Sequence, residues 1–153
     1  MIETPQIVEL PAQKLAAIRL NIPRNEIQNV MGPGIMEIFG ALGSQGIQPA
    51  GPWLSHHFKM VPDTFDFEIC VPVNQDVEPT GRVVMSSLPA HKVARTVYQG
   101  GYEGLGDAWG EFMDWITAQN LSPAEDLWEV YLAGPESSSN PADWKTQLNK
   151  PIA

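Results

Sequence analysis

The chain has 153 residues, 43% of them hydrophobic, so it is long enough for one well-buried core and short for two independent domains. Nine basic and eighteen acidic side chains give a formal net charge of −9, which opposes binding to a phosphate backbone and argues against direct contact with nucleic acid. We expect a cytoplasmic protein without a membrane segment, because no apolar run reaches the length of a membrane span and the first residues lack the pattern of a signal peptide.

The first elements in chain order are two short apolar stretches, 6–10 and 14–20, which meet at Pro11-Ala12. Since proline cannot donate a hydrogen bond within a sheet, the pattern predicts one strand interrupted by a bend or bulge. Pro33 opens the next segment and is expected at the first helical position. The predicted helix is short, with apolar residues at helical spacing and a glycine close to its end: Ile35, Ile38, Phe39, Leu42 and Gly43.

A hairpin is predicted next, with strands at 53–60 and 65–73. Alternate residues of the second strand are apolar and should face one side of the sheet, whereas Asp66 and Glu68 should face the other. Cys70 is the single cysteine, so it has no partner for a disulfide or a metal cluster and is expected as a small core residue. The apolar face of the strand consists of Phe65, Phe67, Ile69, Val71 and Val73.

The second half of the chain shows the same order of elements. A second bent strand is predicted at 82–88 and 91–98, followed by a helix whose apolar stripe has spacings of four, three and four. A final hairpin is predicted from strands at 127–132 and 144–152, joined by a loop at 133–143 that is rich in Gly, Pro and Ser. The helical stripe consists of Leu105, Trp109, Phe112 and Ile116, and the acidic residues Asp107, Glu111 and Asp114 share another face that we expect to be solvated.

Two pairs of similar segments indicate that this order of elements is a repeat. Residues 10–16 (LPAQKLA) and 88–94 (LPAHKVA) are identical at five of seven positions. Residues 45–50 (QGIQPA) correspond in the same order to 119–124 (QNLSPA), and a short aromatic run follows each of them. The repeated unit is therefore a supersecondary structure rather than one motif.

The repeat predicts the fold class. We expect one α+β domain over residues 1–153, built as a duplicated strand-helix-strand-strand module with pseudo-two-fold symmetry. Its halves, at about 6–73 and 82–152, would form an antiparallel sheet with two helices. A groove is expected between the halves.

Several short segments at scattered positions of the second half form a further pattern: Leu88-Pro89-Ala90, the run from Gly100 to Leu105 (GGYEGL), the run from Leu127 to Tyr131 (LWEVY), Asp143-Trp144-Lys145-Thr146 and Pro151-Ile152. This pattern resembles the GyrI-like effector-binding family, the ligand domain of AraC-type and MerR-type multidrug regulators. The resemblance covers essentially the whole chain and implies the duplicated fold expected above. It further implies an apolar, aromatic-lined groove with a buried carboxylate that meets cationic, amphipathic ligands, and Glu129 matches that carboxylate. No helix-turn-helix precedes Gln6, so the chain resembles a stand-alone member.

Glu129 is the main candidate for a functional group. Strand parity places it on the same face as Tyr131, whereas Trp128 and Val130 point to the other face. A carboxylate buried among aromatic side chains is costly unless it is paired. Glu129 is therefore a counter-charge for a ligand, an acid/base group with a raised pKa, or a carboxylate that is exposed or paired with an arginine such as Arg95.

Three further candidates lie at the second helix. Tyr102 follows two glycines at the entrance to this helix, where its phenol would project over the groove or pack on the core. Trp109 and Met113 lie one helical turn apart and would form a wall of the groove, although a stripe of this kind is more often core. Phe112 and Ile116 are expected in the core.

The first half offers the equivalent positions from the other side of the pseudo-two-fold axis. Ser55 aligns with Glu129 and His57 with Tyr131, and Trp53 should approach the groove beside them. One half would then offer a carboxylate where the other offers a small hydroxyl, which suits a ligand with one cationic end. No metal or other cofactor is expected, because His57 and the histidine before it point to opposite faces and no third ligand has suitable spacing.

The expected function is binding of hydrophobic or amphipathic, cationic small molecules, for sequestration or sensing, with Glu129 fixing their orientation. One alternative is a hydrolase, since some stand-alone relatives hydrolyse cyclopropane-bearing toxins. Glu129 would then position or activate water, and Tyr102 would donate a proton or a hydrogen bond. Another alternative is a protein-interaction module, as in the gyrase-inhibiting relatives, so a protein partner or a homodimer stays open.

Overall fold

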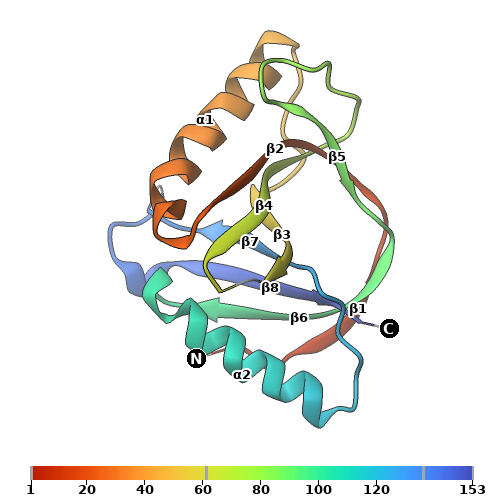
Figure 1. Cartoon of the computed structure of the whole chain (residues 1–153), viewed down its shortest axis with the longest axis vertical. Coiled ribbons are helices and arrows are strands. Elements are labelled where there is room, and N and C mark those ends of the chain that lie inside the picture. Colours follow the sequence, from red (N-terminus) through yellow and green to blue (C-terminus); the bar gives the residue numbers. More distant parts are fainter. Residues whose placement is uncertain (1, 61, 136, 153) are drawn as a thin grey trace. The chain divides into compact units, whose positions relative to one another are not determined.

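The computed structural model describes residues 2–60, 62–135 and 137–152, which form eight β-strands, two α-helices and three short 3-10 turns (Figure 1). The chain separates into two compact units. The central unit is Pro11–Ala90, and the terminal unit consists of the residues up to Leu10 and from His91 onwards. The strand pairs within both units are antiparallel, which confirms the α+β class.

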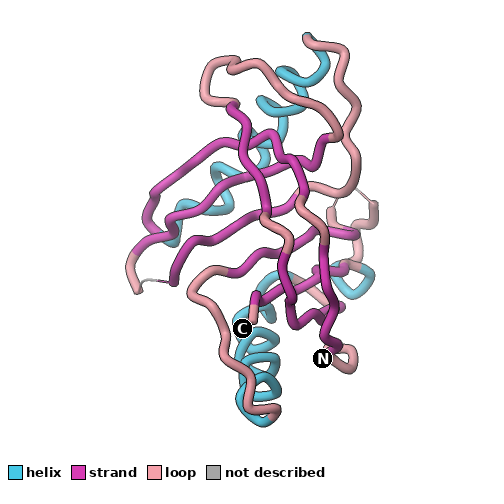
Figure 2. Tube along the Cα trace, turned by 90° about the vertical axis from the view of Figure 1, so that its right-hand side faces the viewer, coloured by secondary structure: helices cyan, strands magenta, loops and turns pink. Residues whose placement is uncertain are grey.

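The central unit is a four-stranded antiparallel sheet with the order β5-β2-β4-β3 and one helix, α1. Figure 2 shows α1 lying along one face of these strands. The predicted hairpin is confirmed, and its residue parity places the apolar stripe of the second strand against α1. The bounds are β2 Gln13–Pro23, α1 Ile27–Ser44, β3 Leu54–Met60, β4 Thr64–Val73 and β5 Val84–Leu88.

The core of the central unit lies between α1 and the sheet. Ile38 and Leu42 of α1 are fully buried against Phe67 and Ile69 of β4. Each such side chain contributes roughly 1.5–3 kcal/mol through burial. A Cβ atom at Gly34 would lie 2.5 Å from Cδ1 of Ile69, so this glycine allows α1 to approach the strand closely.

Helix α1 starts six residues earlier than expected, so Pro33 lies inside it rather than at its first position. Proline in a helix interior removes one backbone hydrogen bond and costs about 3 kcal/mol. The preceding turn nevertheless stays helical because Ile27, Val30 and Met31 pack against the core. Within the described part of the chain, no helix is long and apolar enough to cross a membrane.

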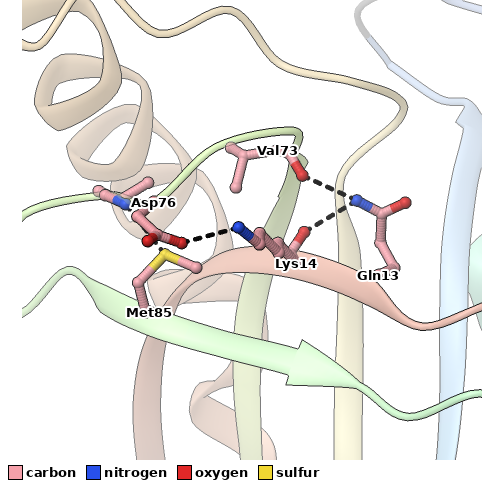
Figure 3. A network of polar contacts seen from close by, with 6 residues as sticks. Gln13, Lys14, Val73, Asp76 and Met85 are labelled. Carbon is pink, nitrogen blue, oxygen red and sulfur yellow. Dashed lines mark hydrogen bonds and ion pairs between the residues drawn. The ribbon is translucent and has the colours of Figure 1, made fainter.

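Polar contacts tie the connection between β4 and β5 back onto β2 (Figure 3). The ammonium group of Lys14 lies 2.9 Å from a carboxylate oxygen of Asp76, and the side-chain amide of Gln13 donates to the carbonyl of Val73 across 2.9 Å. The ion pair is exposed and contributes less than about 1 kcal/mol. The backbone N–H of Val77 donates to the sulfur of Met85, and this places the connection beside β5.

The terminal unit has the same arrangement, with the strand order β1-β6-β8-β7 and one helix, α2. The predicted stripe of α2 is confirmed, since Phe112 and Ile116 are fully buried against Tyr98 and Leu148 of the sheet. Cys70, in the other unit, is also fully buried. The bounds are β1 Gln6–Leu10, β6 His91–Gln99, α2 Leu105–Ala118, β7 Leu127–Ala133 and β8 Lys145–Pro151.

The two predicted bent strands are each two separate strands with different partners. β1 ends before Pro11 and pairs with β6, whereas β2 begins after it and pairs with β4 and β5. In the same way β5 ends before Pro89 and pairs with β2, whereas β6 pairs with β1 and β8. Proline lacks the N–H that a continuous ladder needs, so the strand stops at this point instead of bending.

Candidate functional site

The candidate site lies on the face of the terminal-unit sheet that α2 covers. In the antiparallel register of β7 and β8, Glu129 is opposite Leu148 and Tyr131 is opposite Thr146. Leu148 belongs to the core beneath α2. Because residues opposite each other share a face, Glu129 and Tyr131 both point towards the helix, as their sequence parity predicts.

The carboxylate of Glu129 receives one neutral hydrogen bond on each oxygen. The indole N–H of Trp109 donates to Oε2 across 2.6 Å, and the phenol O–H of Tyr131 donates to Oε1 across 2.8 Å. Trp109 lies on α2, so these contacts join the helix to the strand. Two donors hold the carboxylate in one orientation.

No cationic side chain within the described residues forms an ion pair with Glu129. Pairing with Arg95, one of the expected alternatives, does not occur. Arg95 donates from Nε to the side-chain oxygen of Asn149 across 2.6 Å, and burial lowers its pKa. In the sheet register Asn149 is opposite Trp128, so Arg95 and Asn149 lie on the face away from α2.

Burial raises the pKa of Glu129, and the hydrogen bonds from Trp109 and Tyr131 only partly oppose this shift. The residue as a whole is half-buried. Loss of hydration disfavours the ionised form, and no nearby cation restores it. The group can therefore act as a counter-charge for a cation or as a proton carrier.

Further aromatic rings lie next to those that hold the carboxylate. The rings of Tyr102 and Tyr131 are 6.1 Å apart in an edge-to-face arrangement, and the ring of Trp144 lies 4.9 Å from that of Tyr102. On the other side Trp109 lies 5.6 Å from Phe112. Glu129 therefore lies within a group of four aromatic side chains that we call the aromatic cluster: Tyr102, Trp109, Tyr131 and Trp144.

Trp144 is the member of the cluster that was not expected among the site residues. It follows the loop at 133–143, and its indole N–H donates to the carbonyl of Ser138 across 2.9 Å. The 3-10 turn Pro141–Asp143 directs the chain from this loop into β8. The sequence offered two signals, the place of Trp144 among the residues that carry the family resemblance and its position after a loop rich in Gly, Pro and Ser, but neither signal fixes the direction of the side chain.

The glycines before α2 explain how Tyr102 reaches this position. Gly100 has a φ of 144°, a left-handed conformation that side chains rarely adopt, and a Cβ atom at Gly104 would overlap the phenol oxygen of Tyr98. That phenol donates to the carbonyl of Gly101 across 2.8 Å. The chain thus wraps around Tyr98 and turns through the 3-10 turn Tyr102–Gly104 into the helix, which places Tyr102 beside Tyr131.

The remaining candidates of the terminal unit divide between core and cluster. Met113 is half-buried and packs against the core beneath α2, as does Trp109, which in addition contacts Glu129. A shallow hollow of about 310 Å³ elsewhere on this unit is lined by Glu111, Trp115 and residues 2–5, and it does not include the aromatic cluster.

Trp53, Ser55 and His57 belong to the central unit. Ser55 is opposite Ile69 and His57 is opposite Phe67, so both lie on the sheet face that α1 covers. Ser55 is fully buried, His57 is 4% exposed, and Trp53 packs partly buried against the same core. The shared groove expected for these three residues and Glu129 stays a prediction.

In the described ranges 2–60, 62–135 and 137–152, no group of three or more His, Cys, Asp or Glu side chains is arranged so that it could hold a metal ion. The Nε2 atom of His57 contacts Oγ of Ser55 at 3.1 Å instead. His56 points to the opposite face of the sheet, where its ring lies 4.7 Å from that of Phe58.

Comparison with protein families gives one match over nearly the whole chain. The sequence profile of the GyrI-like small molecule binding domain matches residues 3–153. The EcmrR C-terminal domain has a similar structure, with a TM-score of 0.87 and 19% identity over 98% of this chain and 97% of that one. A comparison with curated protein sequences finds no significant match.

Other solved structures share the fold. EcmrR in a complex with DNA matches with a TM-score of 0.86 and 18% identity over 97% of this chain, which spans 57% of the EcmrR chain. A hydrolase from Listeria innocua matches with a TM-score of 0.70 and 13% identity, over 97% of this chain and 91% of that one. SAV2435 bound to tetraphenylphosphonium matches with a TM-score of 0.67 and 13% identity, over 99% of this chain and 94% of that one. At these identities the similarity shows the fold alone.

Proposed function

Because the chain belongs to the GyrI-like family of small-molecule binding domains, we propose that its terminal unit binds hydrophobic or amphipathic organic cations at Glu129. One observation carries the proposal. The carboxylate of Glu129 is held by two neutral donors among aromatic rings and has no ion-pair partner within the described residues.

Electrostatics favours a cation at this position. A largely desolvated carboxylate without a partner is costly, and a bound positive charge removes most of this cost. The hydrogen bonds from Trp109 and Tyr131 fix the carboxylate before a ligand arrives, so little side-chain entropy is lost on binding. The net charge of −9 also raises the local concentration of cations near the protein.

The aromatic cluster supplies the second part of the affinity. A cation over the face of an indole or phenol ring gains roughly 0.5–2 kcal/mol, depending on how far it is desolvated. Flat or bulky apolar groups of a ligand gain dispersion energy against Tyr102 and Trp144, whose rings are already in contact. The neighbour SAV2435, which has been solved with a lipophilic phosphonium cation, supports this ligand class.

The test uses two ions of nearly equal size and opposite charge. We expect the wild-type protein to bind tetraphenylphosphonium and to discriminate against tetraphenylborate, measured by titration calorimetry and by quenching of tryptophan fluorescence. Glu129→Gln should reduce this discrimination at least tenfold. Glu111→Gln removes the same charge from an exposed position on α2 and should leave it unchanged. Equal binding of both ions by the wild type, or full discrimination by Glu129→Gln, would contradict the proposal.

This binding would serve one of two biological roles, which are sensing and sequestration of the ligand. The neighbour EcmrR has been solved in a complex with DNA, and the present chain spans 57% of it. We infer no DNA contact for the present residues, because their net charge of −9 repels a phosphate backbone. A filter-binding assay on duplex DNA at 50 mM salt should show no retention.

A hydrolase is the second candidate function, acting on cyclopropane-bearing compounds as expected from the sequence. The observation that favours it is the raised pKa of Glu129 beside the hydroxyl of Tyr131, with the phenol of Tyr102 in ring contact. The Listeria innocua neighbour is described as a hydrolase. Turnover of a cyclopropane-bearing compound that is lost in Glu129→Gln would establish this function, and stoichiometric binding without product would exclude it for that compound.

A further inference from the structure

The sheet face of the terminal unit that points away from α2 carries a charged group that the proposed cation site does not use. In the antiparallel register, Arg95 of β6 lies opposite Asn149 of β8 and, on its other side, opposite Gln6 of β1. Residues opposite each other share a face, so these three side chains form one row. Arg95 is half-buried and Gln6 is exposed, so this row is open to solvent on the side of β1.

The guanidinium of Arg95 lacks the kind of partner that two other arginines of the chain have. Arg19 and Arg82 each donate from Nε and Nη2 to both oxygens of one carboxylate, across 2.9 to 3.3 Å. Arg95 donates from Nε alone, to the neutral side-chain oxygen of Asn149 across 2.6 Å. It forms no ion pair with any described residue, and its two Nη groups make no hydrogen bond within that part of the chain.

Asn149 holds this guanidinium in one direction. The asparagine is fully buried, and its side-chain N–H donates to Oε1 of Gln147 across 3.3 Å while its oxygen accepts from Arg95. An amide that uses both its oxygen and its nitrogen cannot turn over without losing both hydrogen bonds. The Nη groups of Arg95 are therefore oriented before any ligand arrives, which reduces the entropy lost on binding.

The charges on this face are opposite in sign to the net charge of the chain. The positions of β1, β6, β7 and β8 that point away from α2 include Arg95 and Lys145 and, within these described strands, no aspartate or glutamate. Both acidic residues of these strands, Glu9 and Glu129, point towards α2. Burial lowers the pKa of Arg95, and no carboxylate opposes this shift. A partly desolvated cation without a counter-charge is costly, and a bound anion removes part of that cost.

Two valines beside these donors determine which kind of anion fits. Val97 and Val130 lie opposite Gln147 on its two neighbouring strands, so the three residues form the row next to that of Arg95. Both valines are half-buried. Successive rows on one face of a sheet are about 7 Å apart, a distance that a short carbon chain spans. An anion with such a chain can bury aliphatic surface on the valines, whereas an inorganic anion has no apolar part to bury.

We propose that Arg95 is the centre of an anion site that binds an organic carboxylate with a short aliphatic chain, with the carboxylate on the two Nη groups and the chain over Val97 and Val130. A planar carboxylate accepts two parallel hydrogen bonds from a guanidinium, which is the arrangement that Arg19 and Arg82 already show within the chain. This site goes beyond the proposed cation binding, because it takes a ligand of opposite charge on the other face of the sheet and does not involve Glu129.

The test follows the side-chain Nε–H signals of the arginines by nitrogen-15 NMR while sodium hexanoate is added to the whole chain. We expect the Arg95 signal to shift and saturate, whereas the signals of Arg19 and Arg82, whose donors are occupied by carboxylates, do not change. Hexanamide has the same chain without the charge and should bind at least tenfold more weakly. Glu129→Gln should leave the hexanoate titration unchanged, so failure of the cation site and failure of this site are distinguishable.

Two variants of Arg95 separate the charge from the geometry, with the backbone amide signals of Val97 and Val130 as the measurement. Arg95→Gln removes both and should weaken hexanoate binding at least tenfold. Arg95→Lys keeps the charge without the paired donors, should weaken binding several-fold, and keeps the test available if Arg95→Gln does not fold. Lys92→Gln is the matched control, because it removes the same charge from an exposed position of β6 that points to the opposite face, and it should bind as the wild type does.

Three results would overturn the proposal. Hexanoate that leaves the Arg95 signal in place at the highest concentration at which the protein stays folded would show that the guanidinium is only hydrated. Binding to Arg95→Gln that equals binding to the wild type would place the anion elsewhere. Inorganic phosphate that binds as tightly as hexanoate would show an attraction of charge alone, without the aliphatic contact to Val97 and Val130.

Discussion

The indole N–H of Trp109 lies 2.6 Å from Oε2 of Glu129, so a donor that cannot reverse its role holds one side of the carboxyl group. The phenol of Tyr131 on the other oxygen can reverse, since a hydroxyl both donates and accepts. Ionised Glu129 accepts from both residues. Protonated Glu129 can still accept from Trp109 while it donates to Tyr131, so both carboxyl oxygens keep a hydrogen-bond partner in both protonation states.

Cation binding should therefore depend on pH. A cation prefers ionised Glu129, whose folded-state pKa lies above the ordinary value of 4.5 because of burial. The affinity for tetraphenylphosphonium should be constant above the folded pKa and fall about tenfold per pH unit below it. Calorimetry in two buffers with different ionisation enthalpies should detect proton release near that pKa. Affinity that is flat down to pH 4.5 would contradict the assignment.

The raised pKa of Glu129 also predicts how the stability of the fold depends on pH. The folded state holds the Glu129 proton more tightly than the unfolded state does. The protonated side chain therefore contributes to the free energy of unfolding below pH 4.5, and this contribution is lost as the pH rises through the folded pKa. Glu129→Gln should therefore flatten the fall in the free energy of unfolding over this window, measured by urea denaturation without ligand. Glu111→Gln should retain the wild-type profile.

Removing the indole donor should weaken cation binding without removing the ring. Trp109→Phe deletes the hydrogen bond to Oε2, and a bond to a charged group contributes about 1.5–3 kcal/mol. The pKa of Glu129 should rise further, and the affinity for tetraphenylphosphonium at pH 7 should fall about tenfold. Carbon-13 NMR of the labelled carboxyl group measures the first effect. Trp115→Phe, on the same helix but outside the aromatic cluster, is the control and should change neither quantity.

His57 should make the protein less stable in acid. Its pKa is lowered to about 4 in the folded state, whereas the unfolded state titrates near 6.5, so only the unfolded state takes up this proton between these values. Stability should fall by up to about 1.4 kcal/mol per pH unit as the pH drops from 6.5 to 4. Urea denaturation of His57→Phe should lack this component, and His91→Gln should retain it. An unchanged slope in His57→Phe would refute the prediction.

The close approach of Gly104 and Tyr98 gives a prediction about stability alone. Gly104→Ala places a Cβ atom against the Tyr98 phenol and should cost about 1–3 kcal/mol. Tyr98→Phe alone should cost about 1 kcal/mol, because it loses the hydrogen bond to the carbonyl of Gly101. The double variant should be more stable than the sum of these costs predicts, since it removes the clashing oxygen. Gly106→Ala, with open space around it, should be neutral or stabilising.

Much of the fold could be predicted because it follows from the local periodicity of apolar residues in the sequence. The alternation in β4 and the helical spacing in α2 both place their apolar residues correctly against a core. The predicted start of α1 was wrong because the preference of Pro33 for the first helical position stabilises less than the burial of the turn before it. The pairing of β1 with β6 could not be predicted, since partner choice depends on residues distant in sequence and leaves no local pattern.

The candidate site was predictable where strand parity decides direction. Spacing alone places Glu129 and Tyr131 on one face, and the structure joins them by a hydrogen bond. Trp109 was expected only as a wall or core residue, because a helical stripe does not show which member lies opposite a strand carboxylate. Trp144 depends on the loop that precedes it, whose internal hydrogen bonds are set by the side chains of Ser138 and Asn140.

The exchange of first strands between the units sets an order for folding during protein synthesis. The central unit, Pro11–Ala90, is continuous in sequence and can fold as soon as it has left the ribosome. β1 precedes the central unit in the chain, yet its partner β6 begins only at His91, after the whole central unit has been made. Until then β1 lacks the strand with which it pairs in the native structure. β1 is therefore made before the central unit but finds its place in the native structure after it.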